Sequence, residues 1–422
     1  MAQVVENCRR IRITNEAAGA FGVEQAIANF VDLFAREDSV KLMLNEPQET
    51  PMLLQQHVDG YPIKVNLPKT GQLDFKANLS AFSARSTLAP HVLTAQPEHL
   101  LWLISMGGMA QTTGQAVVSA ASTTAITLTD AVAAGVVEGS VVAFPTGVGG
   151  ALEARVVKTV VANVITLKLA LSAVPSAGMI MYGGVTYFLD NTSGATVQSL
   201  QAAYEGLDDN DRYLLKGGQL AAPMSFELGP GTVPQVTWSW MFADHKYADG
   251  VQTTMNLTTA PIADQNLPSS GINTVMDSAF IVRPNAGSTL IGIVDASQIT
   301  ITPNVKYVAH KTPGGVNTVK QWVRMRPDGP AVVGDFLVPH DDRSWFDVMA
   351  AKTSHHLSFQ IGSTVAGGCV LIDVPNVLID DVQRESVDGI AGVRVKFYAR
   401  LDQSTTTNLT NLQKSALRIS RL

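Results

Sequence analysis

Residues 236–242 read VTWSWMF, and every second one of them is large and apolar. The alternation returns at residues 393–397, VRVKF, and each run follows a turn signal, Gly229-Pro230-Gly231 or Asp388-Gly389. Alternation with a period of two predicts half-buried antiparallel strands, and the turns predict hairpins. Outward from these runs the same pattern continues from about residue 40, while helical spacing occurs only at 17–35, 97–106 and 343–352. We therefore expect a mostly β fold with a few short helices.

The composition excludes several classes of protein. Only 16% of the 422 residues are charged, and the formal charge of −6 leaves no positive surplus for holding phosphate backbones, which argues against a dedicated nucleic-acid binder. Cys8 and Cys369 are too few for a disulfide framework or a four-thiolate zinc site, so we expect buried thiols. No signal peptide is evident at the amino terminus, and the uncharged runs are too polar or too broken by glycine and proline for a membrane helix. These features predict a protein made in the cytoplasm without a membrane partner.

Residues 113–185 differ from the rest of the chain and repeat internally. The first copy contains Val117-Val118, Ile126-Thr127-Leu128 and Gly139. The second copy contains Val156-Val157, Ile165-Thr166-Leu167 and Gly178, each at an offset of 39 residues from its counterpart. Two copies of a three-strand unit would close a small β-barrel or sandwich, inserted between glycine-containing flanks.

Without this insert, the remainder shows a weaker duplication of helix, strand and hairpin. Residues 97–102, 198–204, 223–228 and 236–240 correspond to 343–345, 356–361, 375–379 and 393–397. We therefore predict a first module of residues 1–112 plus 186–250, the inserted β-domain at 113–185, a second module at 251–402 and a polar C-terminal arm at 403–422.

No motif with catalytic spacing is present, and we expect no catalytic, cofactor or metal site. The best metal candidate combines two histidine positions with acidic residues, but its spacing does not force convergence, and a helix cap with a loop explains it more simply. Its members are His340, Asp341, Asp342, His355 and His356. Three further groups have simple interpretations: a polar turn for Asp208–Asp211, an unconstrained pair for Asp244-His245, and a solvated strand edge for Arg9, Arg10 and Arg12.

Trp238, Trp240 and Phe242 lie on one face of a strand, where they would serve either as a stacking platform for carbohydrate or bases or as a core face. Val236 belongs to the same stripe, which favours the core.

The two hairpins, residues 214–244 and 369–398, together with the short helix at 97–106, resemble the tail tube proteins of long-tailed bacteriophages. The resemblance is one of pattern over the chain outside the insert. It implies subunits that pair strand edges to close a ring with an inner β-barrel, and rings that stack into a tube for DNA ejection. It also implies location in the virion tail, after synthesis in the host cytoplasm, and contacts with other phage tail proteins. Two tandem modules in one chain imply a homotrimeric, pseudo-hexameric ring.

Net negative charge suits such a conduit, because it lets DNA pass through the lumen without specific binding. Between the early strands, residues 45–51 contain two prolines and cannot continue a central strand, which predicts a long loop. The resemblance implies that this loop reaches the neighbouring ring; a surface loop without such a role is the other interpretation. The expected inter-ring contacts are Glu46, Gln48, Glu49, Met52 and Leu53.

Two other functional classes stay open on the sequence alone. One is a different virion part, such as a baseplate hub or a capsid decoration protein. The other is a carbohydrate-binding or hydrolytic β-protein that uses Trp238 and Trp240 as its platform.

Overall fold

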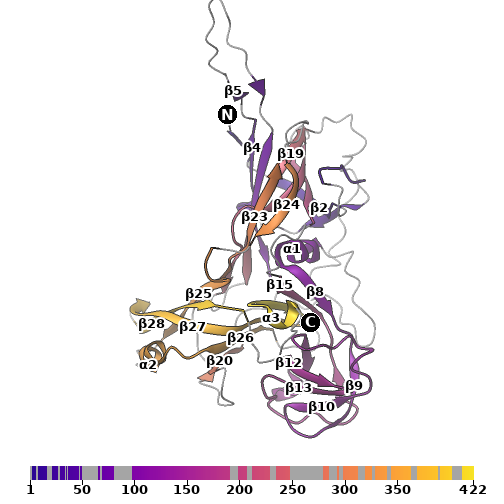
Figure 1. Ribbon diagram of the computed structural model, residues 1–422, viewed down its shortest axis with the longest axis vertical. Coiled ribbons are helices and arrows are strands. Elements are labelled where there is room, and N and C mark those ends of the chain that lie inside the picture. Colours follow the sequence, from indigo (N-terminus) through magenta and orange to yellow (C-terminus); the bar gives the residue numbers. More distant parts are fainter. Residues whose placement is uncertain are drawn as a thin grey trace, which may run out of the picture.

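Antiparallel strands dominate the structure (Figure 1), which confirms the mostly β fold. The computed structural model describes residues 2–5, 8–16, 21–26, 29–33, 35, 37–46, 48–49, 65–66, 69–79, 97–190, 198–206, 212–228, 234–247, 279–284, 292–293, 298–311, 319–325, 328–339, 344–362, 368–387, 390–401 and 411–422. Within these residues there are three α-helices: α1 (Pro97–Met106), α2 (Ser344–Ala351) and α3 (Asn411–Lys414).

The first structural unit, called repeat 1 below, is a sheet in which neighbouring strands are all antiparallel. Its order is β3-β2-β16-β17/β18-β19-β7-β4, and α1 lies between β7 and β16 along the chain. The strands are β2 (Cys8–Asn15), β3 (Val31–Leu33), β4 (Lys41–Asn45), β7 (Thr70–Asn78), β16 (Leu200–Gly206), β17 (Arg212–Leu220), β18 (Ser225–Leu228) and β19 (Gln235–Tyr247).

The second unit, repeat 2, has the same strand order, β21-β20-β26-β27-β28-β25-β22, with α2 between β25 and β26. Its strands are β20 (Ala279–Pro284), β21 (Gly292–Ile293), β22 (Gln298–Pro303), β25 (Val332–Pro339), β26 (His355–Ile361), β27 (Val370–Val387) and β28 (Ile390–Ala399).

The two repeats also agree in register. Residues 71–78 pair with 235–242 in repeat 1, and residues 332–339 pair with 392–399 in repeat 2. This alignment places Asp74-Phe75 on Asp335-Phe336 and Val236 on Val393. Because six strand pairings recur in the same chain order, the part of the chain outside the insert is a structural duplication.

The alignment corrects one detail of the sequence comparison. Ser225 pairs with Thr237, and its equivalent Gln383 pairs with Arg394, so β18 corresponds to residues 383–386 and not to 375–379. The reason is that β27 runs as one strand of 18 residues where repeat 1 breaks into β17 and β18.

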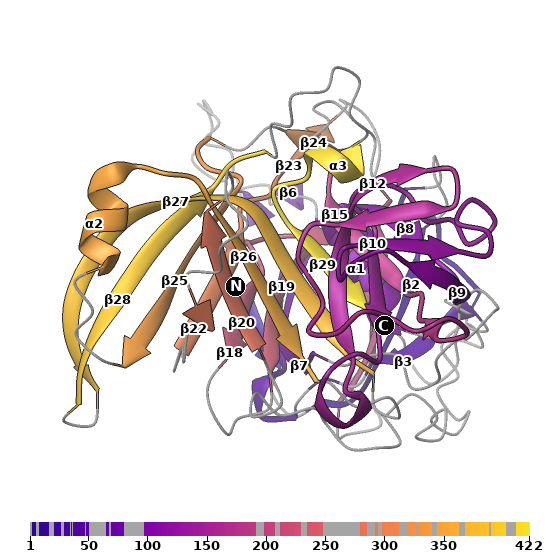
Figure 2. The same cartoon turned by 90° about the horizontal axis from the view of Figure 1, so that it is seen from below.

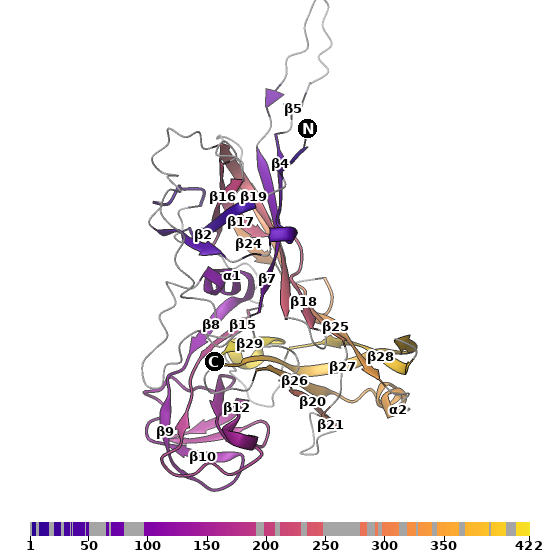
Figure 3. The same ribbon diagram turned by 180° about the vertical axis from the view of Figure 1, so that it is seen from behind.

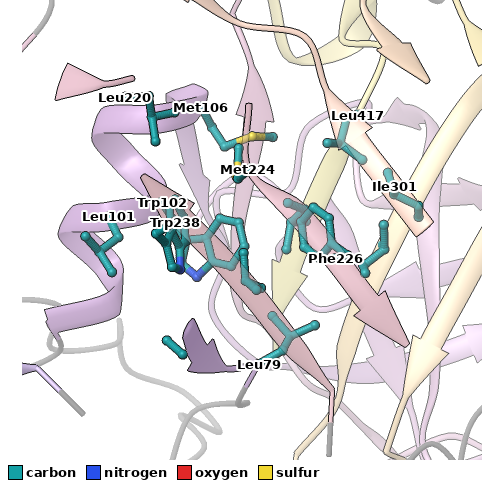
Figure 4. Close-up of a cluster of buried hydrophobic side chains, with 14 of the residues drawn as sticks. Leu79, Leu101, Trp102, Met106, Leu220, Met224, Phe226, Trp238, Ile301 and Leu417 are labelled. Atoms are coloured by element: carbon teal, nitrogen blue, oxygen red, sulfur yellow. The ribbon is translucent and has the colours of Figure 1, made fainter. Parts of the chain in front are cut away.

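Alternating apolar residues from both repeats form one continuous core. Trp238, Trp240 and Phe242 are at most 1% exposed, which confirms the core interpretation of that stripe. Trp102 of α1 packs edge-on against Trp238 with 4.9 Å between ring centroids and stacks on Phe226 at 5.7 Å (Figure 4). In repeat 2, α2 provides Trp345, which packs against Phe336 at 5.2 Å. Each helix therefore covers its sheet with one tryptophan.

Residues 115–181 form a separate six-stranded sheet, β11-β12-β13-β10-β9-β14, with its own core. Ile126 pairs with Ile165 and Ala143 bridges to Tyr182, each pair separated by the 39 residues of the sequence repeat. The two halves are therefore related by a pseudo-twofold axis, and the second bridge closes the sheet. The strands are β9 (Gln115–Ala120), β10 (Ala125–Leu128), β11 (Val141–Phe144), β12 (Glu153–Val161), β13 (Val164–Leu167) and β14 (Ile180–Met181).

The insert leaves the main sheet through the paired strands β8 (Gly107–Gln111) and β15 (Val185–Leu189), and it packs against repeat 2 (Figures 2 and 3). Val141, Ala143 and Leu152 of the insert share a buried cluster with Cys369 and Leu422. The Gln360 amide of β26 donates to Leu152 O at 2.7 Å and accepts from Ala154 N at 2.8 Å. The insert thus has its own core and also covers part of repeat 2.

The expected polar C-terminal arm is wrong for residues 411–422. Strand β29 (Arg418–Arg421) pairs with β15 on one side and with β27 on the other, and residues 415–422 are buried. The apolar residues Leu417, Ile419 and Leu422 are buried, and their burial stabilises the strand in this position. The prediction of an arm followed the polar composition of the preceding segment, which does not determine where these residues lie.

Each repeat carries a two-stranded hairpin, called its arm below, at the same place in the chain. The arm lies between β4 and β7 in repeat 1 and between β22 and β25 in repeat 2. In repeat 1 it consists of β5 (Gln48–Glu49) paired with β6 (Val65–Asn66) beyond the end of β4 (Figure 1). In repeat 2 it consists of β23 (Lys306–Lys311) paired with β24 (Val319–Met325). At the amino terminus, β1 (Ala2–Val5) pairs with residues 42–45 of β4.

Candidate functional site

The two histidines at 355 and 356, which the sequence suggests as the best metal candidate, serve structural roles. His356 on β26 contacts Asp373 on β27, and Asp373 also accepts a hydrogen bond at 2.8 Å from Arg418 on β29. The side chains of His356, Asp373 and Arg418 are at most 2% exposed. Burial acts to raise the pKa of Asp373, but the charges of His356 and Arg418 and the hydrogen bond from His356 outweigh it and hold the pKa well below its usual range. This triad fastens the C-terminal strand to repeat 2.

Two other ionisable side chains that the sequence singles out, His355 and Asp244, also have structural partners. His355 contacts the carbonyl oxygen of Thr353 through Nδ1 at 2.8 Å, and burial lowers its pKa. Asp244 pairs with Lys216 at 3.0 Å rather than with a nucleophile. Residues 208–211 and 340–342 lie outside the described residues. Among the residues that the structure describes, no three His, Cys, Asp or Glu side chains are grouped so that they could hold a metal ion.

The expectation of a solvated edge around Arg10 and Arg12 is wrong. Strand β2 lies between β3 and β16, and the two guanidinium groups flank Asp32 at 2.7 and 3.2 Å. Burial lowers the pKa of Arg12, and the charge of Asp32 opposes that effect. Arg10 and Arg12 are therefore part of the interior of repeat 1 and not of a solvated edge.

The two repeats contact each other through the edges of their sheets. Strand β22 of repeat 2 pairs edge to edge with β18 of repeat 1, so that Phe226 lies opposite Ile301. Both side chains are at most 2% exposed, because each strand covers the other's edge. The junction therefore joins the two sheets through backbone hydrogen bonds and a shared core.

The arm of repeat 2 completes this junction by capping α1. Tyr307 donates to Ile104 O at 3.1 Å or Ser105 O at 2.8 Å, and Arg324 donates to Met106 O at 3.1 Å and to the Tyr307 hydroxyl at 2.7 Å. The last carbonyls of a helix have no partner within the helix and carry its negative dipole end, so a guanidinium there is favourable. Burial raises the pKa of Tyr307, while Arg324 acts to lower it.

Two further contacts fix the arm. Trp322 donates its indole N–H to Gly217 O on β17 at 2.8 Å. Gly107, the residue after α1, has φ +85, and a Cβ there would lie 1.9 Å from Arg324 Nη1. Glycine at this position thus permits both the left-handed turn that ends the helix and the approach of the guanidinium. Nothing in the local sequence pattern marks Tyr307, Trp322 or Arg324, because a strand side chain that contacts a distant helix has no local signature.

The strands equivalent to the two strands of the junction, the outer part of β27 and β4, have partly unpaired edges within the described part of the chain. At residues 370–373 β27 has β26 on one side and β29 on the other, and β26 continues beside it to Val377, but from residue 378 onward β27 pairs only with β28. At the other end of the chain, β1 covers β4 only from residue 42 to 45, and Lys41 pairs only with β7. Unpaired edges favour association with another strand.

Of the five residues expected to contact a neighbouring ring, the structure describes Glu46, Gln48 and Glu49. Glu46 follows β4 and binds Lys69 at 2.6 Å and His245 at 3.1 Å, both in the same chain. The hydrogen bond from Lys69 lowers the pKa of Glu46. Gln48 and Glu49 form β5, whereas Met52 and Leu53 lie outside the described residues. The inter-ring role of these residues stays a prediction.

Comparison with known proteins provides no family. No family model matches the chain, and no curated protein matches its sequence. Among the described residues, no helix is long and apolar enough to cross a membrane.

Proposed function

We propose that this chain is a structural subunit that assembles into rings of three copies, which stack into the tail tube of a long-tailed bacteriophage. The observation that carries the proposal is the junction between the repeats, in which β22 pairs with β18 and the arm caps α1. This junction joins two equivalent modules side by side within one chain. In a ring, contacts of the same kind would join modules of neighbouring chains.

The unpaired edges support the same function. From residue 378 onward, one edge of β27 is unpaired in the described residues, and this part of β27 is equivalent to β18, one of the two strands of the junction. The equivalent of the other strand, β4, is covered by β1 except at Lys41. Association between copies in a ring would cover the β27 edge in every copy. The number of six modules, and thus three chains, comes from the resemblance to tail tube proteins.

The carbohydrate-binding alternative has lost its main support, because Trp238 and Trp240 are buried in the core. Electron microscopy of the purified protein tests the proposal. Stacked rings that extend into tubes would support it, while isolated rings would favour a baseplate hub. A protein that stays monomeric at high concentration would contradict it.

A further inference from the structure

Glu16, the residue after β2, carries a buried carboxylate that the proposed function does not use. The residue is 1% exposed, and its two oxygens accept hydrogen bonds from Gly22 N at 2.9 Å, Gly217 N at 2.7 Å and Gln201 Nε2 at 3.0 Å. Burial raises the pKa of this carboxyl, and the hydrogen bonds from neutral groups act to lower it. A buried carboxylate is costly unless it is hydrogen-bonded, so Glu16 stays enclosed only while these bonds persist.

Residues 21–25, called the strap below, are held on β16 and β17 through their backbone. Gln201 on β16 is fully buried, and its amide accepts a hydrogen bond from Gln25 N at 3.1 Å and donates one to Val23 O. The Val23 side chain is 56% exposed, so its burial contributes little to this contact. The position of the strap therefore depends on the polar side chains of Glu16 and Gln201.

Gly217 connects the strap to the arm of repeat 2. The pairing of β16 with β17 shifts register opposite Gln201, and Gly217 has φ +64 in this bulge. Its N–H donates to Glu16, while its carbonyl oxygen accepts the indole N–H of Trp322 at 2.8 Å. A Cβ at Gly217 would lie 2.5 Å from Phe21 Cζ, so the strap packs directly on this backbone. One residue thus contacts the strap, its anchor and the arm.

We propose that the strap and the arm of repeat 2 form one conformational device, in which the strap locks the arm onto α1 through Glu16 and Gly217. When the strap opens, the Glu16 carboxylate becomes hydrated and Gly217 loses the bond that fixes its N–H. The carbonyl acceptor of Trp322 then moves, and the arm loses one of the contacts that hold it beside the end of α1. The device sets how firmly the two repeats are joined. It does not depend on the proposed function, because all of its parts lie in one chain.

A coupling between two sites acts equally in both directions. Weakening the bond of Trp322 must therefore loosen the strap, just as breaking the bonds of Glu16 must loosen the arm. A purely local role of Glu16 would change the strap alone, so the response of the distant partner distinguishes the two cases.

Hydrogen exchange measured by mass spectrometry on the full-length protein tests the coupling, because local opening exposes backbone amides to exchange. Glu16→Gln replaces one acceptor oxygen by an amide group that faces an N–H donor, so a buried hydrogen bond is lost. We expect exchange about tenfold faster in peptides that cover the strap and also in those that cover residues 319–325. Trp322→Phe keeps an aromatic ring but removes the indole N–H, and it should speed exchange in the strap.

The matched control is Asp373→Asn, which breaks a buried ion pair elsewhere in the chain and should leave exchange in the strap unchanged. An unchanged arm in Glu16→Gln, or an unchanged strap in Trp322→Phe, would overturn the device. A response of the strap to Asp373→Asn as large as its response to Trp322→Phe would also overturn it, because the effect would then be global. If Glu16→Gln does not fold, the conservative Trp322→Phe variant decides alone.

Discussion

The buried triad of His356, Asp373 and Arg418 gives the sharpest test of how the C-terminal strand is held. Asp373 is fully buried and Arg418 is 1% exposed, and the Asp373 carboxylate contacts both Arg418 and His356. Asp373→Asn keeps the size of the side chain but leaves the guanidinium with its hydrogen bonds to the neutral carbonyl oxygens of Leu412 and Gln413. Removing one partner of a buried ion pair costs about 3–5 kcal/mol, and the retained hydrogen bonds favour the lower end, about 3 kcal/mol.

The assay is urea denaturation followed by tryptophan fluorescence, with a double-mutant cycle. Arg418→Met should cost a similar amount, but the double variant should cost much less than the sum, because replacing both partners by groups without charge leaves neither charge of this pair buried alone. Asp328→Asn, which breaks the exposed pair of Asp328 with Lys306, is the matched control and should have little effect. Additive losses in the cycle would refute the coupling.

The pH dependence follows from the direction of the Asp373 shift. Its pKa is lowered in the folded protein, so its contribution is present above the unfolded pKa of about 3.9 and is lost as the pH falls through the folded value. The stability difference between wild type and Asp373→Asn should therefore shrink as the pH falls below about 4. A difference that stays unchanged between pH 4 and 2 would contradict this assignment.

Three further predictions concern the core, the insert and the arm. Trp238→Ala should destabilise the protein by about 3–5 kcal/mol in urea denaturation, because the ring is 1% exposed and packs on Trp102; a small effect would contradict its core role. Deleting residues 113–183 with a Gly-Ser bridge should uncover Cys369 and make it react with a thiol reagent in a Cys8→Ser background; an unreactive thiol would mean that the insert contributes little to that cluster. Replacing Glu46 to Thr50 by Gly-Ser should preserve the melting curve but shorten tubes seen by electron microscopy; loss of rings as well would assign the arm to contacts within the ring, and unchanged tubes would mean that stacking depends on other residues.

Much of the fold was predictable, because alternation is a local signal. The strand at 236–242, the helix at 97–106 and the repeat of 39 residues in the insert follow from the spacing of apolar residues alone. The duplication was visible only in outline, since its repeats share few identities and the equivalence lies in strand pairing. Register is set by contacts between distant segments, which explains why the sequence comparison matches 375–379 to the wrong strand.

The assembly residues were less predictable than the fold. Arg324 acts through the carbonyls of a helix more than two hundred residues away in sequence, and Leu417 to Leu422 are buried because β15 and β27 leave a gap between them that a strand fills. Neither contact can be recognised from the local amino-acid composition. The polar residues before the last strand suggested an arm, while the apolar residues within it determine its burial.

Counting the chains in a ring tests the central claim most directly. Native mass spectrometry of rings, combined with image averages viewed along the axis, measures both the number of copies and the apparent symmetry. Two equivalent modules per chain predict three copies arranged with pseudo-sixfold symmetry. A ring of six complete chains would contradict the account, because the internal junction would then not be one of the contacts that close it.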